Sequence, residues 1–462
     1  MTDSALAAAV QKMRQAGAHG EAILAFENAY GRLVSGQEAM LPTSELEPAE
    51  DVPVLEDLDE AQAGEALESV AVIKLNGGLA TTMGLQEPKS LVQAREGRSF
   101  LDIIIAQTLA LRRRHGVRLP LILMNSDATK TATEQVLAGY PELAQAGIAP
   151  DFMQSMIPKL EADSLGPVSW LRAPALEWCP PGHGDVYGAL RRSGMLNALL
   201  AQGFRYAMIA NSDNLGARID ARIPAHMARE DIPFLMEVVQ GTEADRKGGH
   251  IARRRSDGQL VLRETAQTPA QDAASFRDFR RWRYYNTNNL WVDLRALAQT
   301  LDESGGVLEL PLIVNRKTVD PRDPESTPVI QLESAMGAAI ESFAGASLLL
   351  VPRPRFVPVK TTDDLLVLRS DVYALNRELE VEAVPERAQS LPFVELDPRF
   401  YKLIDDFERR IPDGPPSLRE AERLVVRGDV TFGAGVVARG AVELDVSEPT
   451  RIEPGAVLES GP

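Results

Sequence analysis

Cysteine and histidine are scarce in this sequence, which holds one cysteine and five histidines. Because Cys179 has no second thiol to pair with, an internal disulfide is excluded and a reducing, cytoplasmic compartment is favoured. No set of Cys and His residues has the spacing of a structural zinc site. Nothing in the pattern pairs Cys179 with an activating histidine, so we expect its thiol to be structural.

Basic residues and long apolar segments are also few in this sequence. The sequence has 49 basic and 66 acidic residues, which gives a formal net charge of −17. An acidic surface repels polyanions, so we expect neither nucleic acid nor an anionic membrane as a partner. No segment reaches the ~18 uncharged apolar residues that a membrane helix requires. A small anionic ligand remains compatible, because a few lysines and backbone N–H groups can outweigh distant charge within a Debye length of ~8 Å.

The apolar pattern divides the chain into three predicted parts. Residues 4–37 have apolar side chains at three- and four-residue steps, including Ile23, Phe26 and Tyr30, which predicts a helix with one buried stripe. A stretch rich in proline and acidic residues follows and is typical of a linker. We therefore expect a helical extension and linker over 1–68, a main domain over 69–385, and a C-terminal domain over 386–462.

The main domain contains short, nearly continuous apolar runs between longer helical patterns. Such runs are buried on both faces, which predicts an α/β fold with a mostly parallel sheet between helices. The runs are 70–75, 119–126, 206–213, 232–239, 289–294 and 347–352. In such folds ligands bind at the carboxyl ends of the strands, so the polar residues that follow these runs are the candidates for function.

The C-terminal domain carries a different repeat. Leu424, Val430, Val436 and Val442 recur every six residues, with glycines between them. This period predicts a left-handed β-helix that completes one turn about every eighteen residues. A pair of ordinary hairpins is the alternative.

The first candidate for chemistry is the segment KLNGGLATTMG (74–84), which directly follows a predicted strand and precedes Lys89. Gly77 and Gly78 allow close approach of the backbone, turn N–H groups can bind phosphate oxygens, and Lys89 adds a positive charge. The segment matches neither GxGxxG nor GxxxxGK[ST]. A simple turn after the strand is the alternative.

The second candidate is Asp213, which the run YAMIANSDN delivers to the carboxyl end of a buried strand. One carboxylate suits Mg²⁺, which takes one or two protein oxygens and completes its shell with phosphates and water. A helix cap or an Asx turn is the alternative.

Weaker candidates follow later in the chain. His183 lies in a loop constrained by proline and glycine, where it is open to a ligand. A general base is not required there, because a phosphate monoester has a second pKa near ~6 and is already ionised at neutral pH. Asn286 and Asn288 could bind sugar hydroxyls, and Lys360 follows an apolar stretch.

Taken together, the motifs resemble those of the eukaryotic-type UTP–glucose-1-phosphate uridylyltransferase (UDP-glucose pyrophosphorylase) family. The resemblance runs from about Val70 to nearly the end of the chain. It is carried, in the family's order, by KLNGGLATTMG with PKS, FMQSMIP, EWCPPGHGDVYGAL, NSDNLGA, TEADRKGG, LRETAQTP, NTNNLWV, VIQLESAMGAAI, PVKTTDDLL and GDVTFGAGV. The sequence departs from the family at Ala80, where a further glycine is usual, at Cys179, which replaces an aromatic residue, and in the QSMIPKL run.

The resemblance implies a Rossmann-like nucleotidyltransferase core that converts UTP and glucose 1-phosphate to UDP-glucose and pyrophosphate with Mg²⁺. The implied nucleotide-binding positions are Leu75, Asn76, Gly77, Gly78, Lys89, Gln154, Gly182, Asn211, Asp213 and Lys360. The implied sugar-phosphate positions are His183, Gly249, Glu264, Asn286 and Asn288. Asp213 would hold the metal, and Lys89 and Lys360 would be the catalytic groups. Another sugar 1-phosphate, a silent nucleotide-sugar scaffold, and a homo-oligomer formed through the C-terminal domain stay open.

Overall fold

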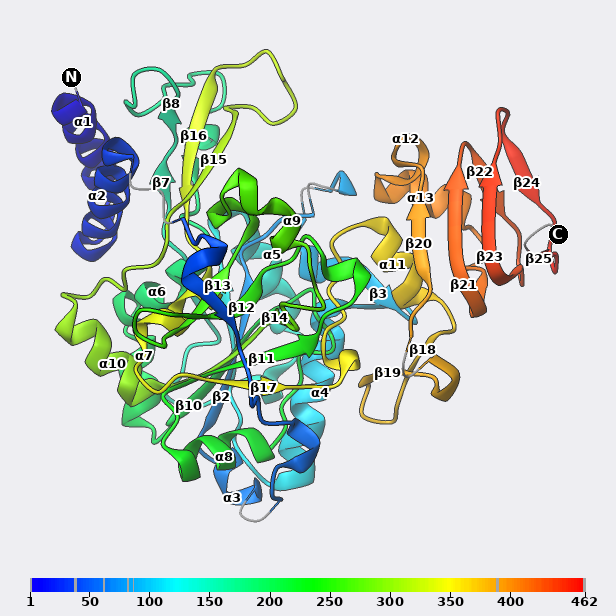
Figure 1. Ribbon diagram of the computed structural model, residues 1–462, viewed down its shortest axis with the longest axis horizontal. Coiled ribbons are helices and arrows are strands. Elements are labelled where there is room, and N and C mark those ends of the chain that lie inside the picture. Colours follow the sequence, from blue (N-terminus) through cyan, green and yellow to red (C-terminus); the bar gives the residue numbers. More distant parts are fainter. Residues whose placement is uncertain are drawn as a thin grey trace.

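The computed structural model describes residues 2–36, 40–60, 63–80, 83–85, 87–387 and 390–459. A ten-stranded mixed sheet lies at its centre (Figure 1). The main path of the sheet is β1 (Leu46–Pro48), β12 (His250–Arg254), β14 (Tyr284–Asp293), β10 (Tyr206–Asn211), β2 (Val70–Asn76), β5 (Leu121–Asn125) and β6 (Asp151–Met153). Off this path, β13 (Leu260–Arg263) pairs with β12, while β11 (Phe234–Gln240) pairs with β14 and with β17 (Ser347–Leu350).

All six predicted apolar runs are strands of this sheet, so the α/β prediction is confirmed. β10, β2, β5 and β6 are parallel neighbours, as are β11 and β17. β14 instead runs antiparallel to both β10 and β11. The start of β14 therefore lies at the same edge of the sheet as the carboxyl ends of β2 and β10.

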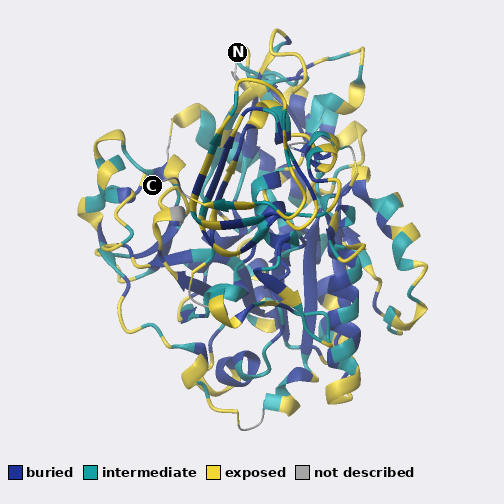
Figure 2. Cartoon of the chain, turned by 90° about the vertical axis from the view of Figure 1, so that its right-hand side faces the viewer, coloured by how far each residue is buried: buried dark blue, intermediate teal, exposed yellow. Residues whose placement is uncertain are grey.

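The strands are apolar throughout because the sheet is covered on both faces. Along β2, Val70 and Val72 belong to one core cluster with Phe100, whereas Ala71 and Ile73 belong to a second. The principal covering helices are α4 (Phe100–His115), α5 (Asp127–Leu137), α6 (Val186–Arg192), α7 (Met195–Ala201), α8 (Arg222–Glu230) and α10 (Leu294–Glu303). Figure 2 shows the buried strands at the centre and the exposed residues on the outer turns.

The N-terminal segment forms two helices, α1 (Thr2–Gln15) and α2 (Gly20–Ser35), and not the single helix predicted over 4–37. The chain turns between them at Gly17, whose φ of 78° is in the left-handed region. The predicted stripe of Ile23, Phe26 and Tyr30 is buried, but it packs outside the central sheet. Its partners come from short strands outside the central sheet: β7 (Ile157–Pro158), β8 (Leu160–Glu161), β9 (Trp178–Cys179) and β16 (Pro328–Glu333). β16 pairs with β15 (Ile313–Thr318), and Figure 1 shows these two strands with β7 and β8 on the same side of the molecule as α1 and α2.

The chain between α2 and β2 is partly docked on the sheet. β1 pairs with β12 as an edge strand, and α3 (Ala63–Leu67) precedes β2. The remaining elements before the C-terminal coils are β3 (Gln93–Arg95), β4 (Arg98–Ser99), α9 (Ala273–Phe276), α11 (Thr362–Arg369), β18 (Tyr373–Leu375) and β19 (Val381–Ala383). Within the described part of the chain, no helix is long and apolar enough to cross a membrane.

In the C-terminal segment, the chain forms successive turns, here called coils, and the strands of one turn pair in parallel with those of the next. They are β20 (Phe393–Leu396), β21 (Ser417–Arg427), β22 (Val430–Phe432), β23 (Val437–Asp445), β24 (Thr450–Ile452) and β25 (Val457–Glu459), with α12 (Pro398–Tyr401) and α13 (Ile404–Arg410) inserted. Parallel pairing excludes the hairpin alternative, because a hairpin pairs antiparallel strands. All four residues of the six-residue repeat are buried, and Leu424 lies opposite Val442 on the next coil.

Candidate active site

Two distant parts of the chain meet through an ion pair at the edge of the sheet. Lys89 Nζ donates a hydrogen bond of 2.6 Å to Asp213 Oδ2, and the two side chains are only 18% and 15% exposed. A third part joins them, because the N–H of Val359 donates to the carbonyl of Asp213 at 3.2 Å. Lys360 follows directly, and its side chain is exposed. The structure thus brings together the three segments that carry the predicted lysines and carboxylate.

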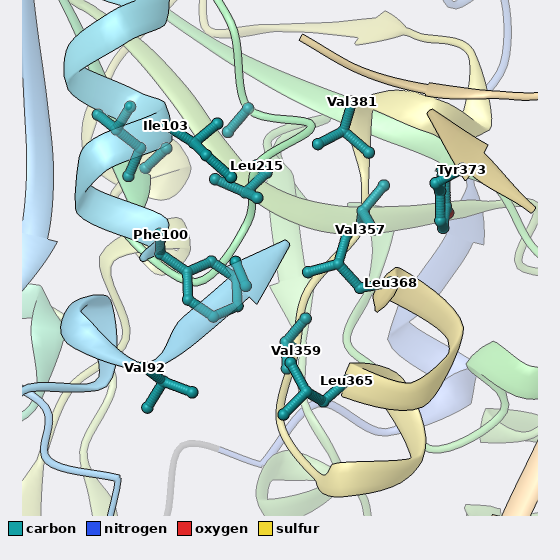
Figure 3. Packing of buried hydrophobic residues seen from close by; sticks show 14 of the residues in the cluster. Val92, Phe100, Ile103, Leu215, Val357, Val359, Leu365, Leu368, Tyr373 and Val381 are labelled. Carbon is teal, nitrogen blue, oxygen red and sulfur yellow. The ribbon is translucent and has the colours of Figure 1, made fainter. Parts of the chain in front are cut away.

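Apolar packing explains why these segments converge (Figure 3). Val92 lies three positions after Lys89, Leu215 lies two after Asp213, and Val359 immediately precedes Lys360. The three apolar side chains are buried in one core cluster. Figure 3 shows Leu365 and Leu368 of α11 beside Val357 and Val359. Each polar residue therefore follows or precedes an anchor that fixes its backbone.

The described part of the glycine loop borders the open cleft. A Cβ at Gly77 would lie 2.6 Å from Gln154 Oε1, so the Gln154 amide packs directly against the glycine and would have to shift for a larger residue. The N–H of Lys89 donates to the carbonyl of Gly78 at 3.1 Å, which closes the loop. Ala80 is fully buried in the apolar core and its φ is not left-handed, so its methyl group points away from the cleft. Residues 81–82 and 86 lie outside the described part.

Two of the predicted nucleotide positions offer only their backbone. Asn76 is 2% exposed, and its Nδ2 donates to Asn125 Oδ1 and to Thr133 Oγ1, each at 2.8 Å. Leu75 is also buried, and its carbonyl accepts from the N–H of Ser212 at 3.2 Å. The Asn76 side chain therefore joins the sheet to α5, and the Leu75 side chain packs in the core on one face of the sheet. Asn211 ends β10 at the same edge.

A second wall of the cleft is formed by Gln154 and the loop that contains Gly182. Gly182 has a φ of 80°, and a Cβ there would collide with the carbonyl oxygen of Ser334. Conversely, the N–H of Ser334 donates to the carbonyl of Pro181 at 2.9 Å, so the loop is pinned to the end of β16. The cleft has a volume of about 1300 Å³, and its lining includes Gly77, Gly78, Gln154, Trp178, Lys317 and, from the turn between α1 and α2, His19.

His183 is held in one tautomer. The N–H of Met336 donates to its Nδ1 at 2.9 Å, so Nε2 carries the ring proton. Burial and the charge of Lys360 lower the pKa of His183 to about 4, against the opposing effect of Asp213. At neutral pH the ring is uncharged, and it can donate one hydrogen bond but is a weak base.

Four of the five predicted sugar-phosphate positions, all but His183, gather where β12, β13 and β14 meet. A Cβ on Gly249 would lie 2.5 Å from Glu264 Oε1, and the N–H of Asn286 donates to the carbonyl of Gly249 at 3.0 Å. Asn286 and Asn288 are joined by side-chain hydrogen bonds of 2.9 and 2.8 Å. Asn286 borders an irregularity in the pairing of β14 with β11, and Asn288 lies within it with a φ of 56°. Burial raises the pKa of Glu264, and the charge of Lys360 acts in the opposite direction.

Asp213 has one oxygen that suits a metal ion. Its Oδ2 is taken by Lys89, whereas Oδ1 is buried and has no hydrogen-bond partner among the described residues. A buried carboxylate oxygen without a partner is costly unless a cation or a water completes it. Within the described residues, no group of three or more His, Cys, Asp and Glu side chains could hold a metal. The site therefore fits an ion that needs one protein carboxylate and takes its other ligands from phosphates and water.

The sequence did not indicate the buried ion pair beneath the site. Arg355 donates to Glu237 from Nη2 and Nε at 2.6 and 2.8 Å, and both side chains are almost fully buried. Lys74 is also buried, and its Nζ donates to the carbonyl of Ala217 at 2.8 Å. Burial is the main cause that lowers the pKa of Lys74 to about 7. The usable signal was a lone charged residue inside an apolar run, which occurs in both VAVIKL and IPFLMEVV.

A glycine loop, a lysine–aspartate pair and a large cleft at the carboxyl ends of parallel strands are the arrangement of a nucleotide-binding enzyme. A family model described as UTP–glucose-1-phosphate uridylyltransferase matches residues 23–439. The UTP–glucose-1-phosphate uridylyltransferase of Musa acuminata is 38% identical over 448 residues, which are 94% of this chain and 92% of that protein. The Saccharomyces cerevisiae enzyme of the same name is 40% identical over 397 residues, 85% and 78% of the two chains.

Solved structures give the same result. A mutant of the UDP-glucose pyrophosphorylase of Leishmania major, in complex with UDP-glucose, superposes with a TM-score of 0.93 at 42% identity and covers 99% of this chain and 98% of that one. The chain is therefore a nucleotidyltransferase. It belongs to the UTP–glucose-1-phosphate uridylyltransferase family.

Proposed function

We propose that this protein transfers the uridylyl group of UTP to glucose 1-phosphate, which forms UDP-glucose and releases pyrophosphate. The observation that carries the proposal is the convergence of Lys89, Asp213 and the Lys360 segment at one edge of the sheet. The relatives named above support the choice of substrates. A silent nucleotide-sugar scaffold is disfavoured, because such a protein has no need of two lysines beside one carboxylate.

The reaction is an in-line displacement at the α-phosphorus. A phosphate oxygen of glucose 1-phosphate forms the new P–O bond while the bond to the bridging oxygen of pyrophosphate breaks, and pyrophosphate leaves with that electron pair. The attacking phosphate is already ionised at neutral pH, since its second pKa is near ~6. Catalysis then consists of aligning two anions and neutralising the charge that develops between them.

Different residues of this chain align the substrates and neutralise the developing charge. Lys89 and Lys360 supply positive charge next to the phosphates, and the Nε2–H of His183 supplies one hydrogen bond. Bound Mg²⁺ would be held by Asp213 Oδ1 and would neutralise phosphate charge when present. Because Lys89 is paired with Asp213 in this structure, binding of the phosphates must share or replace this ion pair.

The nucleotide and the sugar occupy opposite ends of the site in this proposal. Gln154 lines the cleft at the end assigned to uracil, as does Pro180, two positions before Gly182. Gly249, Glu264, Asn286 and Asn288 lie together at the end assigned to glucose. The two asparagines and the buried carboxyl offer several donors and acceptors for hydroxyl groups. Another sugar 1-phosphate remains the second candidate, because contacts among the described residues do not by themselves select one epimer.

The finer points of organisation belong to the same proposal. We infer an N-terminal helical extension and linker over 1–68, a catalytic domain over 69–385 with a Rossmann-like core, and a C-terminal domain over 386–462. The parallel coils with six-residue spacing support a left-handed β-helix for the last part. A homo-oligomer formed through this domain and a cytoplasmic location complete the inference.

One assay tests the proposal. Purified protein is incubated with UTP, TTP, CTP or ATP and a panel of sugar 1-phosphates, with Mg²⁺ or excess chelator, and products are identified by mass. We expect UDP-glucose from UTP and glucose 1-phosphate only when the divalent cation is present. A different preferred sugar would favour the second candidate, and the absence of any nucleotide sugar would refute the proposal.

A further inference from the structure

Beside the cleft lies a buried ion pair that none of the roles above includes. Arg192, at the end of α6, contacts the carboxylate of Asp185, and their side chains are 7% and 8% exposed. Arg192 Nη2 also donates to Ser155 Oγ at 2.7 Å, and the N–H of Ser155 donates to Asp185 Oδ2 at 2.6 Å. These three residues form a closed ring of hydrogen bonds, in which each member binds the other two.

The ring connects the two segments assigned to the nucleotide base, the one that carries Gln154 and the loop that carries Gly182. Ser155 directly follows Gln154, whose N–H is fixed on the carbonyl of Asn125 at 2.9 Å. Asp185 lies three positions after Gly182, and the N–H of Asp185 donates to the carbonyl of Gly182 at 3.3 Å. The distance between the Gln154 segment and the Gly182 loop is therefore set through Asp185, Arg192 and Ser155.

The packing around Arg192 leaves its guanidinium little freedom. A Cβ on Gly188 would collide with Nη1 of Arg192, so the helix lies directly against the side chain. Arg192 and Ser155 line the main cleft and also a small cavity of about 90 Å³ that α2 covers from behind. A planar guanidinium can bind the carboxylate and the hydroxyl at once, which a lysine ammonium cannot do in the same geometry.

We propose that Arg192 is a positioning residue for recognition of the nucleotide base, acting through Asp185 and Ser155 on Gly182 and Gln154. This inference rests on the proposed function, because it takes Gln154 and Gly182 as the groups that contact uracil. Arg192 affects binding of the base and its discrimination, whereas the phosphate chemistry at Lys89 and Asp213 is left intact. Loss of Arg192 therefore weakens UTP binding more than it lowers kcat.

The test compares Arg192→Met with a matched control on the same helix. Arg191 pairs with Glu21 and Asp302 at the surface and lies outside the cleft lining, so Arg191→Met removes a neighbouring guanidinium without touching the ring. The Kd of UTP is measured by calorimetry, and kcat and KM for UTP, CTP and glucose 1-phosphate are measured by pyrophosphate release. For Arg192→Met we expect the Kd and the KM for UTP to rise about tenfold or more. The preference for UTP over CTP should decrease by a similar factor. These changes are on the order of the loss of one charge-assisted contact. The kcat and the KM for glucose 1-phosphate should stay within about threefold, and Arg191→Met should resemble the wild type.

A second variant separates positioning from stability. Arg192→Met leaves the charge of Asp185 buried and unpaired, which destabilises a fold by itself. Arg192→Met combined with Asp185→Asn removes that charge, while the introduced amide keeps an acceptor for the N–H of Ser155. We expect the double variant to regain thermal stability but to keep the weakened UTP binding. Wild-type UTP affinity in the double variant, or an equal loss for UTP and glucose 1-phosphate, would overturn the inference. Calorimetry measures UTP binding without turnover, so it separates the two proposals. A wild-type protein that binds UTP without making UDP-glucose would refute the proposed reaction. The Kd values of the variants would still decide the role of Arg192.

Discussion

Lys89 and Asp213 lie 124 positions apart in the sequence, yet Lys89 Nζ is 2.6 Å from Asp213 Oδ2. The two oxygens of Asp213 thereby take different environments, because Oδ1 is buried and has no hydrogen-bond partner among the described residues. One carboxylate can therefore orient a lysine and hold a cation at the same time. The charge of Asp213, more than its shape, is what both tasks require.

Asp213→Asn tests that requirement, because the amide keeps the shape and removes the charge. We expect the variant to fold and to melt close to the wild type, since the amide has nearly the same size and shape as the carboxylate. Its kcat should fall by on the order of 10²-fold or more, because Lys89 loses its orienting partner and the cation loses a ligand. Rates are measured across a Mg²⁺ titration, with thermal melting as the control. A folded variant with wild-type rates would refute the metal assignment.

Lys360→Ala should lower kcat far more than it raises the KM for glucose 1-phosphate. Lys360 is exposed, and its charge acts on both His183 and Glu264, so it lies between the phosphate and sugar ends of the site. By analogy with the loss of one preorganised donor, we expect kcat to fall on the order of 10²- to 10³-fold, ~3 to 4 kcal/mol. Lys402→Ala, which removes another exposed lysine, serves as the control. A kcat within about threefold of wild type, less than ~1 kcal/mol, would make Lys360 an ordinary surface lysine.

Much of the fold was predictable because a strand that is buried on both faces is a continuous run of apolar residues in the sequence. The six apolar runs are six strands, and the rule that ligands bind at carboxyl ends predicts a site at Asp213 and the glycine loop. The six-residue repeat likewise marked positions that are all buried in the coils. In each case the pattern reports the environment of consecutive residues.

Features that depend on residues far apart in the sequence have no such local pattern and could not be predicted. The bidentate pair of Arg355 with Glu237 joins positions 118 apart, and no local pattern tells which residue neutralises a charge inside an apolar run. The antiparallel direction of β14 depends on the path of the chain between strands, and this direction brings Asn286 to the edge that holds Asp213. The helix predicted over 4–37 is divided at Gly17 because tertiary packing of α1 against α2 outweighs helix continuation.

Gly182→Ala should harm both stability and UTP binding. Gly182 has a φ of 80°, and a methyl group there would collide with the carbonyl of Ser334. Gly194→Ala is a matched control, because Gly194 has a φ of 76° but a Cβ would meet nothing within 4 Å. We expect the control to cost ~1 kcal/mol of unfolding free energy from backbone strain alone. Gly182→Ala should cost more and should raise the KM for UTP, as measured by urea unfolding and steady-state kinetics. If the two substitutions changed the free energy of unfolding and the KM for UTP equally, the contact between the new methyl group and the Ser334 carbonyl would have no measurable effect.

The stability of the protein should fall in acid partly because of His250. This residue is fully buried, stacks on Trp282 with ring centroids 4.8 Å apart, and neither of its ring nitrogens has a hydrogen-bond partner among the described residues. Burial, aided by the charge of Arg263, lowers its pKa to about 3. An unfolded histidine titrates near ~6.5, so as the pH decreases from there toward 3 the unfolded chain binds a proton that the folded protein does not. The contribution of neutral His250 to stability is therefore complete above ~6.5 and is lost below it, by up to ~1.4 kcal/mol per pH unit.

His250→Phe removes this titration and keeps an aromatic ring against Trp282. Urea unfolding of wild type and variant at several values between pH 7 and pH 4.5 gives the free energy of unfolding of each. We expect the free energy of unfolding of the variant to rise relative to that of the wild type by ~2 to 3 kcal/mol across this interval, because only the wild type loses the contribution of a buried neutral imidazole. His115→Gln, at an exposed position, should follow the wild type. Parallel pH curves for wild type and His250→Phe would mean that His250 is protonated in the folded protein as readily as in the unfolded chain, which would contradict its burial without partners as the cause of acid sensitivity.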